Sequence, residues 1–246
     1  MEQQRAPHDG DEGGRAPGPA SRVSRRWRAV RELLLGAAAV LVLGAVLRLF
    51  VAQVFSIPSG SMEQTLKIGD RVAVEKVSEV LGKNPSRGQV VVFQDPGGWL
   101  PPADDRGGSA LGDFLRWFGL LPDARGELIK RVIGVEGDTV SCQGSGPVRV
   151  NDAALSEPYI FPGNTPCGGV PFGPVKVPPG RLWVMGDHRS DSLDSRFHQA
   201  GPGKGTIPVS TVTGPAVAVI WPFTHWKTLP IPETFRQPGV SRRSGG

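Results

Sequence analysis

An apolar segment near the N-terminus constrains this chain more than any other feature. Residues 33–55 are apolar except for Arg48 and Gln53, and as a helix they would extend about 34 Å, enough to cross a hydrocarbon core of about 30 Å. The pattern predicts one membrane anchor over residues 28–55. Arginines on its N-terminal side place the N-terminus in the cytoplasm; they are Arg22, Arg25, Arg26, Arg28 and Arg31.

A cleavable signal peptide is the alternative interpretation, because a basic flank followed by the apolar core 33–47 fits that pattern too. However, apolar sequence resumes after Arg48, and no clear small-x-small cleavage site precedes Ser56. A retained anchor is therefore the preferred interpretation. It places everything after Phe55 outside the cytoplasm.

Composition limits the rest of the chain. Residues 1–27 and 231–246 are poor in apolar residues, which predicts a disordered cytoplasmic tail and a flexible C-terminal tail. The 34 Gly and 24 Pro residues favour loops and sheets over a helical bundle. The net charge of +5 is modest, and aromatic residues do not alternate with the basic ones. The sequence therefore predicts no nucleic-acid partner.

Short β-branched runs dominate residues 56–230. "RVAVEKV" (71–77) and "GQVVVFQ" (88–94) each follow turn-forming residues, and "LIKRVIGVEGDTVSC" holds two further candidate strands. Strands at this spacing with few helical patterns predict a mainly β fold. We expect an antiparallel β-sheet catalytic domain behind one N-terminal transmembrane helix.

A Pro/Gly-rich insertion at about residues 97–127 interrupts the predicted strands. Within it, apolar residues recur at helical spacing: Leu111, Phe114, Leu115, Phe118 and Leu121. The segment is either a helix packed on the sheet or an aromatic face that contacts lipid beside the anchor.

The two cysteines, Cys142 and Cys167, both fall in the part predicted to be outside, where oxidation is possible. A disulfide between them would close a loop of about 26 residues and stabilise the fold by roughly 3 kcal/mol. Two free buried thiols are the alternative.

Candidate catalytic groups follow the apolar segment directly. "IPSGS" (57–61) places two hydroxyls beside a rigid Pro58, and a serine nucleophile needs a base. His188 and His198 flank the aspartate-containing "RSDSLDSRF", while Lys130 lies among aliphatic residues whose packing can lower a lysine pKa. The G-x-S-x-G, S-x-x-K and K-T-G motifs are absent. Histidine and lysine both remain candidate bases on these residues alone.

Three segments in order carry a resemblance to a known family. "IPSGSMEQTLKIGDRVAVEK", "IKRVIGVEGD" and "GDHRSDSLDSRF", behind an apolar N-terminal segment, resemble the boxes of bacterial type I signal peptidase. The resemblance implies a membrane-anchored serine endopeptidase that removes signal peptides from preproteins after small residues at the −1 and −3 positions. It implies a monomer in the bacterial plasma membrane with an extracytoplasmic catalytic domain, no metal and no organic cofactor. Its partners would be preprotein signal peptides and the lipid bilayer.

The resemblance also assigns roles to single residues. Ser61 corresponds to the nucleophile and Lys130 to the general base of a Ser-Lys dyad. The hydroxyl of Ser59 joins the Ser61 amide in the oxyanion hole, and Ser192 orients the lysine amine. The supporting groups are the pairs Asp194 with Arg196 and Asp187 with Arg131, and Gly186, which leaves room beside the dyad. The walls of the substrate cleft are Phe55, Ile57, Pro58 and Ile129.

The chain departs from the common family pattern at two places. His188 stands where Asn is usual, and Glu63-Gln64 where Met-Pro or similar is common; neither position matches a catalytic role. Two other functions stay open. One is a LexA-like Ser-Lys autoprotease, although no DNA-binding helix pair is visible in the sequence. The other is an inactive membrane-anchored scaffold, against which the presence of Ser59, Ser61, Lys130 and Ser192 argues.

Overall fold

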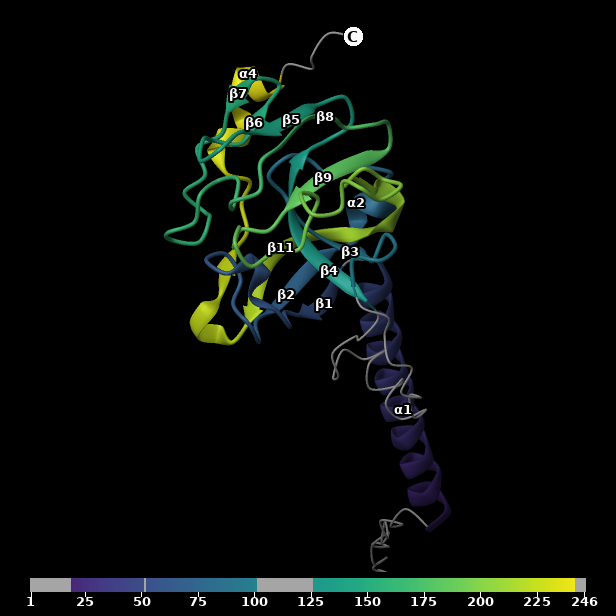
Figure 1. Cartoon of the computed structure of the whole chain (residues 1–246). Coiled ribbons are helices and arrows are strands. Elements are labelled where there is room, and N and C mark those ends of the chain that lie inside the picture. Colours follow the sequence, from purple (N-terminus) through teal and green to yellow (C-terminus); the bar gives the residue numbers. More distant parts are fainter. Residues whose placement is uncertain (1–18, 51, 101–125, 242–246) are drawn as a thin grey trace, which may run out of the picture. The chain divides into compact units, whose positions relative to one another are not determined.

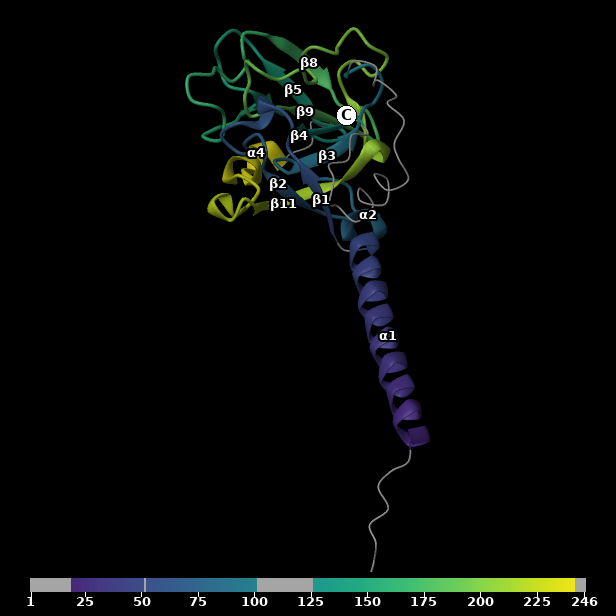
Figure 2. The same cartoon turned by 90° about the horizontal axis from the view of Figure 1, so that it is seen from below.

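The computed structural model describes residues 19–50, 52–100 and 126–241. The chain forms two compact units, residues 1–46 and 47–246 (Figures 1 and 2). The predicted insertion helix, over residues 111–121, lies outside the described residues. The segment that precedes the insertion helix is described up to Leu100. In this segment the Asp95 carboxylate accepts hydrogen bonds from the backbone N–H groups of Gly97, Trp99 and Leu100.

Helix α1 (Pro19–Phe50) makes up the described part of the first unit and runs on into the second. The side chains described in it, at residues 27–28 and 30–44, are exposed, Leu33 to 73% and Val40 to 70%. Among the residues that the structure describes, no helix is both long enough and apolar enough to span a membrane. The predicted anchor is therefore not confirmed.

Two predicted boundaries around this helix are wrong. Residues 19–27 belong to α1 rather than to a disordered tail. At the other end the helix stops at Phe50, and Ala52–Ser56 forms strand β1, although the predicted anchor extends to residue 55. The strand forms because β1 pairs along its whole length with β2 (Arg71–Glu75). This pairing buries Phe55 and leaves its neighbour Val54 exposed.

The second unit is built on antiparallel strands, as predicted. Its larger sheet has eight strands among the described residues, in the order β1-β2-β11-β3-β4-β9-β10, with β12 on β11. Besides β1 and β2, these are β3 (Val90–Gln94), β4 (Glu127–Gly134), β9 (Arg181–Met185), β10 (Ile207–Pro208), β11 (Val212–Trp221) and β12 (Lys227–Thr228). Short helices connect them: η1 (Gly60–Met62), α2 (Val77–Val80), η2 (Val209–Thr211) and η3 (Phe223–His225).

Strand β11 curls this sheet. Its first half pairs with β3 and its second half with β2, and the register shifts at three places, one of them at Gly214. Such bulges bend a strand and increase its twist. The sheet consequently wraps around one apolar cluster that β1, β2, β3, β4 and β11 all share; its members include Phe55, Met62, Leu66, Val72, Val90, Ile129 and Ala216.

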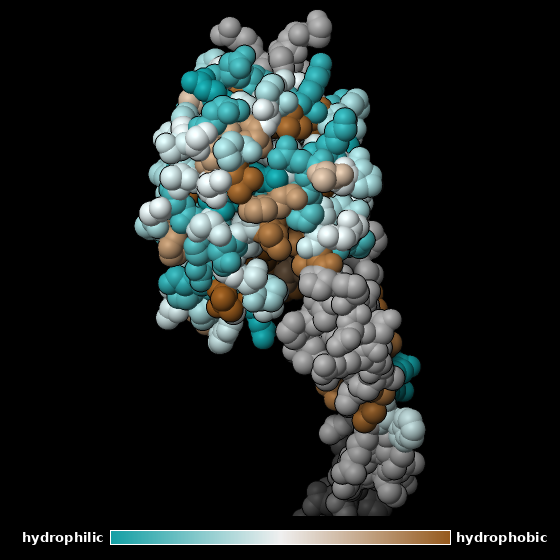
Figure 3. Space-filling view, in the orientation of Figure 1, coloured by the Kyte–Doolittle hydropathy of each residue, from teal (hydrophilic) through white to brown (hydrophobic). Residues whose placement is uncertain are grey.

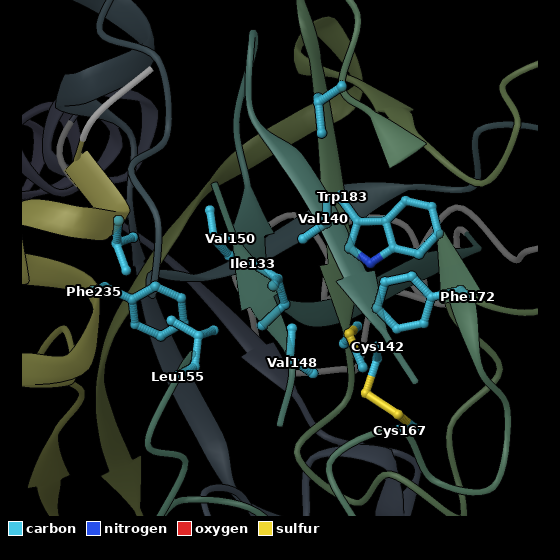
Figure 4. Packing of buried hydrophobic residues seen from close by; sticks show 13 residues of the cluster. Ile133, Val140, Cys142, Val148, Val150, Leu155, Cys167, Phe172, Trp183 and Phe235 are labelled. Atoms are coloured by element: carbon cyan, nitrogen blue, oxygen red, sulfur yellow. A yellow bond between two sulfur atoms is a disulfide. The ribbon is translucent and has the colours of Figure 1, made fainter. Parts of the chain in front are cut away.

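A smaller sheet has the order β7-β6-β5-β8 and lies at the end of the unit away from β1 and β2 (Figure 1). Its strands are β5 (Thr139–Cys142), β6 (Arg149–Val150), β7 (Ala153–Ala154) and β8 (Phe172–Lys176). A second apolar cluster packs against this sheet (Figure 4). Within the cluster, the ring of Phe172 stacks on that of Trp183, with centroids 4.9 Å apart. Cys142 and Cys167 form a disulfide within this cluster, with Cα atoms 5.7 Å apart.

The C-terminal segment packs on the same cluster. Helices η4 (Glu233–Arg236) and α4 (Pro238–Ser241) insert Phe235 and Val240 into it, and Val240 is fully buried. The predicted flexible tail over residues 231–246 is therefore wrong for its described part, because these two apolar side chains fix it. On the face seen in Figure 3, hydrophobic residues gather toward the middle of the β unit, within a largely hydrophilic rim.

Candidate active site

The loop after β1 fixes the position of Ser61. Within it, the N–H groups of Thr65 and Leu66 both donate to the carbonyl of Met62. The side chains of Met62 and Leu66 are fully buried in the cluster inside the curled sheet. These contacts hold the short helix η1 rigidly, and Ser61, 6% exposed, lies within it.

Lys130 approaches from the opposite wall of the curled sheet. It lies in β4 opposite Val91 of β3, and its side chain is 3% exposed. The Nζ atom donates a hydrogen bond to Ser61 Oγ at 2.6 Å. In strand order β1 and β4 are separated by β2, β11 and β3, so the contact depends on the curl of the sheet.

Burial changes the proton affinity of the Lys130 amine. Loss of hydration lowers its pKa from 10.5 to about 8, although the nearby Asp194 carboxylate acts in the opposite direction. At pH 7 roughly a tenth of such amines are neutral, against under ~0.1% for an ordinary lysine. Lys130 is therefore able to accept a proton from Ser61 near neutral pH.

Ser59 places a second hydroxyl beside that of Ser61. Its Oγ lies 3.4 Å from Ser61 Oγ. Ser59 stands at the N-cap position of η1, yet its side chain makes no capping hydrogen bond to the helix. The hydroxyl is thus not engaged in holding this turn.

The segment 186–196 supplies a buried carboxylate near Lys130. Asp194 accepts hydrogen bonds from Ser192 Oγ at 2.8 Å and from the Gly186 N–H at 2.9 Å. It also pairs with Arg196, and both side chains are fully buried. These donors hold the pKa of Asp194 below its usual value, although burial alone would raise it. Asp194 therefore remains ionised next to Lys130.

Gly186 keeps this region compact. A Cβ atom there would lie 2.5 Å from the carbonyl oxygen of Ser61 and would overlap the side chain of Ser192. Ser192 and the loop of Ser61 therefore both pack against the same side of this glycine, where only a residue without a side chain fits. The hydroxyl of Ser192 donates to Asp194, which leaves its lone pairs for other donors.

A second buried ion pair lies on the other side of Lys130. Arg131 Nε and Nη2 donate to the two oxygens of Asp187 at 2.9 and 2.6 Å, and Arg131 Nη1 donates to the Gly88 carbonyl at 2.8 Å. The hydroxyl of Thr65, which was not predicted as a site residue, donates a hydrogen bond to Asp187. The Tyr159 ring covers the guanidinium of Arg131 at 4.3 Å.

Two further groups near the site were not predicted. Arg189 and Glu157 form a buried pair, with Nη2 and Oε1 2.5 Å apart and side chains 0% and 2% exposed. Arg189 also donates to the Pro166 carbonyl, and Arg196 to the Cys167 carbonyl at 2.8 Å. The disulfide-bonded turn is thereby connected to the arginine that holds Asp194.

The predicted cleft walls are only partly exposed. Phe55, Ile57 and Ile129 come together in the cluster inside the curled sheet and are at most 7% exposed, whereas Pro58 is exposed. Strand β1 is at the end of its sheet, and the pairing of β4 with β9 begins at Arg131. Within the described strands, one edge of β1 and one edge of β4 at residues 128–130 therefore carry no partner strand.

The two histidines considered as bases are engaged in other contacts. The His188 ring stacks on Phe161 at 4.1 Å, with Nδ1 3.3 Å from the Gly60 carbonyl. The His198 ring has its Nδ1 2.9 Å from the Asp194 carbonyl. The hydrogen bond to Ser61 Oγ comes from Lys130.

Comparison with known proteins gives sequence matches over most of the chain. Residues 30–221 match the family model described as signal peptidase, peptidase S26. "Signal peptidase I" of Mycobacterium tuberculosis is 39% identical over 85% of this chain and 77% of its own length. "Probable signal peptidase I" of Mycobacterium leprae is 38% identical over 76% of this chain and 75% of its own.

A solved structure gives a weaker match. The crystal structure of a signal peptidase I from Enterococcus faecalis has a TM-score of 0.35 and 21% identity, and it covers 54% of this chain and 97% of its own. The family assignment rests instead on the sequence matches, which extend over most of the chain. This chain belongs to the signal peptidase family, peptidase S26, and is a peptidase.

Proposed function

We propose that this peptidase removes signal peptides from secreted preproteins with a Ser61–Lys130 dyad. The observation that carries the proposal is the hydrogen bond of 2.6 Å between Lys130 Nζ and Ser61 Oγ, made by a lysine that is 3% exposed. A base must lie within about 2.6–3.2 Å of the proton that it removes and have a pKa near the working pH. Lys130 meets both conditions.

The proposed reaction is an acyl transfer in two stages. Neutral Lys130 takes the Ser61 proton as Ser61 Oγ attacks the scissile carbonyl carbon. The resulting ammonium then gives that proton to the leaving amine as the peptide C–N bond breaks, which leaves an acyl-enzyme on Ser61. Lys130 next deprotonates a water molecule, whose attack releases the acyl group. These steps need no metal or organic cofactor.

Two donors stabilise the charge on the carbonyl oxygen. The proposed donors are the Ser61 N–H and the hydroxyl of Ser59, whose Oγ lies 3.4 Å from Ser61 Oγ. Fixed donors contribute most when the oxyanion forms. The hydroxyl of Ser192, held by Asp194, would orient the lysine amine. The Asp194 carboxylate, which Arg196 keeps ionised, favours the ammonium that forms during the reaction, although the charge of Arg196 acts in the opposite direction.

An extended substrate fits the open strand edges. A signal peptide would add a strand between residues 55–59 and residues 127–129 and form main-chain hydrogen bonds with both. Phe55, Ile57 and Ile129 would limit the depth of the pockets for alternate side chains. Shallow pockets account for the proposed preference for small residues at the −1 and −3 positions.

The proposed location is the outer face of the plasma membrane, with the N-terminus in the cytoplasm. The support is the arginine-flanked apolar sequence and the exposure of its side chains along α1. The β unit adds an exposed aromatic group at the end of β11, with Trp221 48%, Phe223 78% and Trp226 72% exposed. Aromatic side chains of this kind are enriched at membrane interfaces.

Cleavage of a preprotein tests the proposal directly. Full-length protein in detergent is incubated with a preprotein, and the product termini are determined by mass spectrometry. We expect wild type and Ser210→Ala, which removes an exposed hydroxyl on η2, to cut after small residues, and Ser61→Ala to be inactive. Cleavage by Ser61→Ala at the wild-type rate would overturn the assignment. Cleavage of the chain itself in place of the preprotein would favour the autoprotease, and an uncut preprotein the scaffold.

A further inference from the structure

The geometry points to Thr65 as a positioning residue that holds the nucleophile loop in register with the strand that carries Lys130. This inference rests on the proposed function. Thr65 is four residues beyond Ser61 in the same compact loop, where its N–H donates to the Met62 carbonyl at 3.0 Å. A displacement of Thr65 is therefore transmitted to Ser61.

The hydroxyl of Thr65 joins three segments of the site. It donates to Asp187 Oδ2 and accepts a hydrogen bond from Arg131 Nη2 at 3.2 Å. Arg131 is the next residue to Lys130 in β4, and Asp187 is the next residue to Gly186. One hydroxyl thus connects the loop of the nucleophile, the strand of the base and the segment packed behind both.

The partners of Thr65 are themselves fixed. Arg131 and Asp187 are 4% and 0% exposed, and Arg131 is held by the Gly88 carbonyl and the ring of Tyr159. A charge-assisted hydrogen bond to such a carboxylate has a narrow range of geometry. The loop also contacts this segment through the His188 N–H, which donates to the Ser61 carbonyl at 3.1 Å. The backbone bond from His188 joins the loop only to segment 186–196. The hydroxyl of Thr65 adds a contact with β4, through Arg131.

Removal of the hydroxyl should loosen the dyad rather than the whole fold. In Thr65→Val the shape of the side chain is retained, while Asp187 keeps both hydrogen bonds from Arg131. Because a misplacement of about 1 Å at a reacting centre can reduce the rate about 10²-fold, we expect kcat to fall between about 10- and 100-fold. KM should change little, since the hydroxyl of Thr65 bonds to Asp187 and Arg131 rather than to residues 55–59 or 127–129.

The pH profile provides a readout that a purely structural role would not move. If the loop shifts away from Lys130, water reaches the amine and its pKa rises from about 8 toward 10.5. The charged groups that face the amine are Asp194, Arg196, Asp187 and Asp191. Thr65→Val replaces none of them, and Asp187, which loses the bond from Thr65, keeps its pair with Arg131. The rising limb of kcat against pH should therefore move to higher pH.

The experiment compares wild type, Thr65→Val, Thr65→Ser and Thr206→Val as full-length proteins in detergent. Thr206 is the matched control, because it is 3% exposed and its hydroxyl also accepts from an arginine, Arg181 Nε, at 2.6 Å. We expect Thr65→Val to have a lower kcat and a rising limb of kcat against pH that lies at higher pH. Thr65→Ser should restore both properties, and Thr206→Val should resemble wild type. A Thr65→Val enzyme with wild-type kcat and pH limb, or a serine variant without rescue, would overturn the inference.

A direct titration separates this inference from the proposed function. The pKa of Lys130 is measured by ¹³C NMR of its Cε in wild type and Thr65→Val, with no substrate present. A higher Lys130 pKa in Thr65→Val supports the positioning role of Thr65, whether or not the wild type cleaves a preprotein. Failure of the wild type to cleave a preprotein would refute the proposed function and leave the positioning role standing. An unchanged pKa refutes the positioning role even if cleavage by wild type is established.

Discussion

The indole ring of Trp99 stacks on the imidazole of His198, with ring centroids 4.2 Å apart and planes inclined by 12°. With its Nδ1 held at the Asp194 carbonyl, this histidine serves the packing of its segment. We therefore expect activity to rise with pH through about 8 as Lys130 loses its proton. His198→Ala should show the same rise of activity with pH, and its turnover should stay within a few-fold of wild type. A limb that disappears in His198→Ala would make histidine the base.

The two members of the dyad should behave as one unit. Ser61→Ala and Lys130→Ala should each abolish cleavage, and the double variant should be no worse than either single variant, because each removes the same proton transfer. Single-turnover assays and thermal melts of all three variants check this. Additive losses would indicate that the two side chains act separately.

Burial of Lys130 should lower the stability of the protein near neutral pH. Its folded-state pKa of about 8 lies below the ordinary 10.5, so between these values the unfolded chain binds more protons and stability rises with pH. Below pH 8 the full penalty, about 3 kcal/mol, is present. Lys130→Met should thus be more stable than wild type at pH 7. The difference in stability between the two proteins should become smaller as the pH approaches 10.5. Denaturant melts at both pH values test this; a constant difference would contradict it.

Ser59→Ala should affect catalysis and not folding. Removal of one oxyanion donor typically reduces kcat by about 10²–10³-fold, and KM should stay near its wild-type value because the donor acts mainly on the transition state. The Ser59 hydroxyl makes no capping bond, so the melting temperature should be unchanged. Ser59→Thr keeps the hydroxyl and should retain much of the activity. A lower melting temperature with kcat within a few-fold of wild type would assign Ser59 to the turn instead.

Topology is tested in intact cells. An external protease should digest residues 56–223, and residues before Arg28 should be protected. N-terminal sequencing of the mature protein is the companion measurement. A new N-terminus downstream of Arg48 would show a cleaved leader in place of an anchor.

Some of this site could be predicted from the sequence because it lies in short contiguous segments. Ser59 and Ser61 share one turn, and the aliphatic neighbours of Lys130 indicate a buried amine. Contacts between distant segments could not be predicted in this way. Thr65 and Asp187 are 122 residues apart, and Arg189 and Glu157 are 32 apart, so their pairing depends on the curled sheet and its loops.

The errors in the fold have a similar origin. An apolar run such as residues 49–55 suits a helix and a buried strand equally, and only pairing with β2 makes Ala52–Ser56 a strand. The C-terminal segment has too few apolar residues for a periodic pattern. Two of them, Phe235 and Val240, suffice to dock it on the smaller sheet.

The disulfide between Cys142 and Cys167 has a consequence for producing the protein. Protein made in the reducing cytosol of an expression host would lack the bridge that tethers the turn whose carbonyl groups accept from Arg189 and Arg196. Such a preparation could keep its secondary structure and still contain a mixture of active and inactive molecules. Secretion into an oxidising compartment, or oxidative refolding, should yield a homogeneous sample for kinetics and crystallisation.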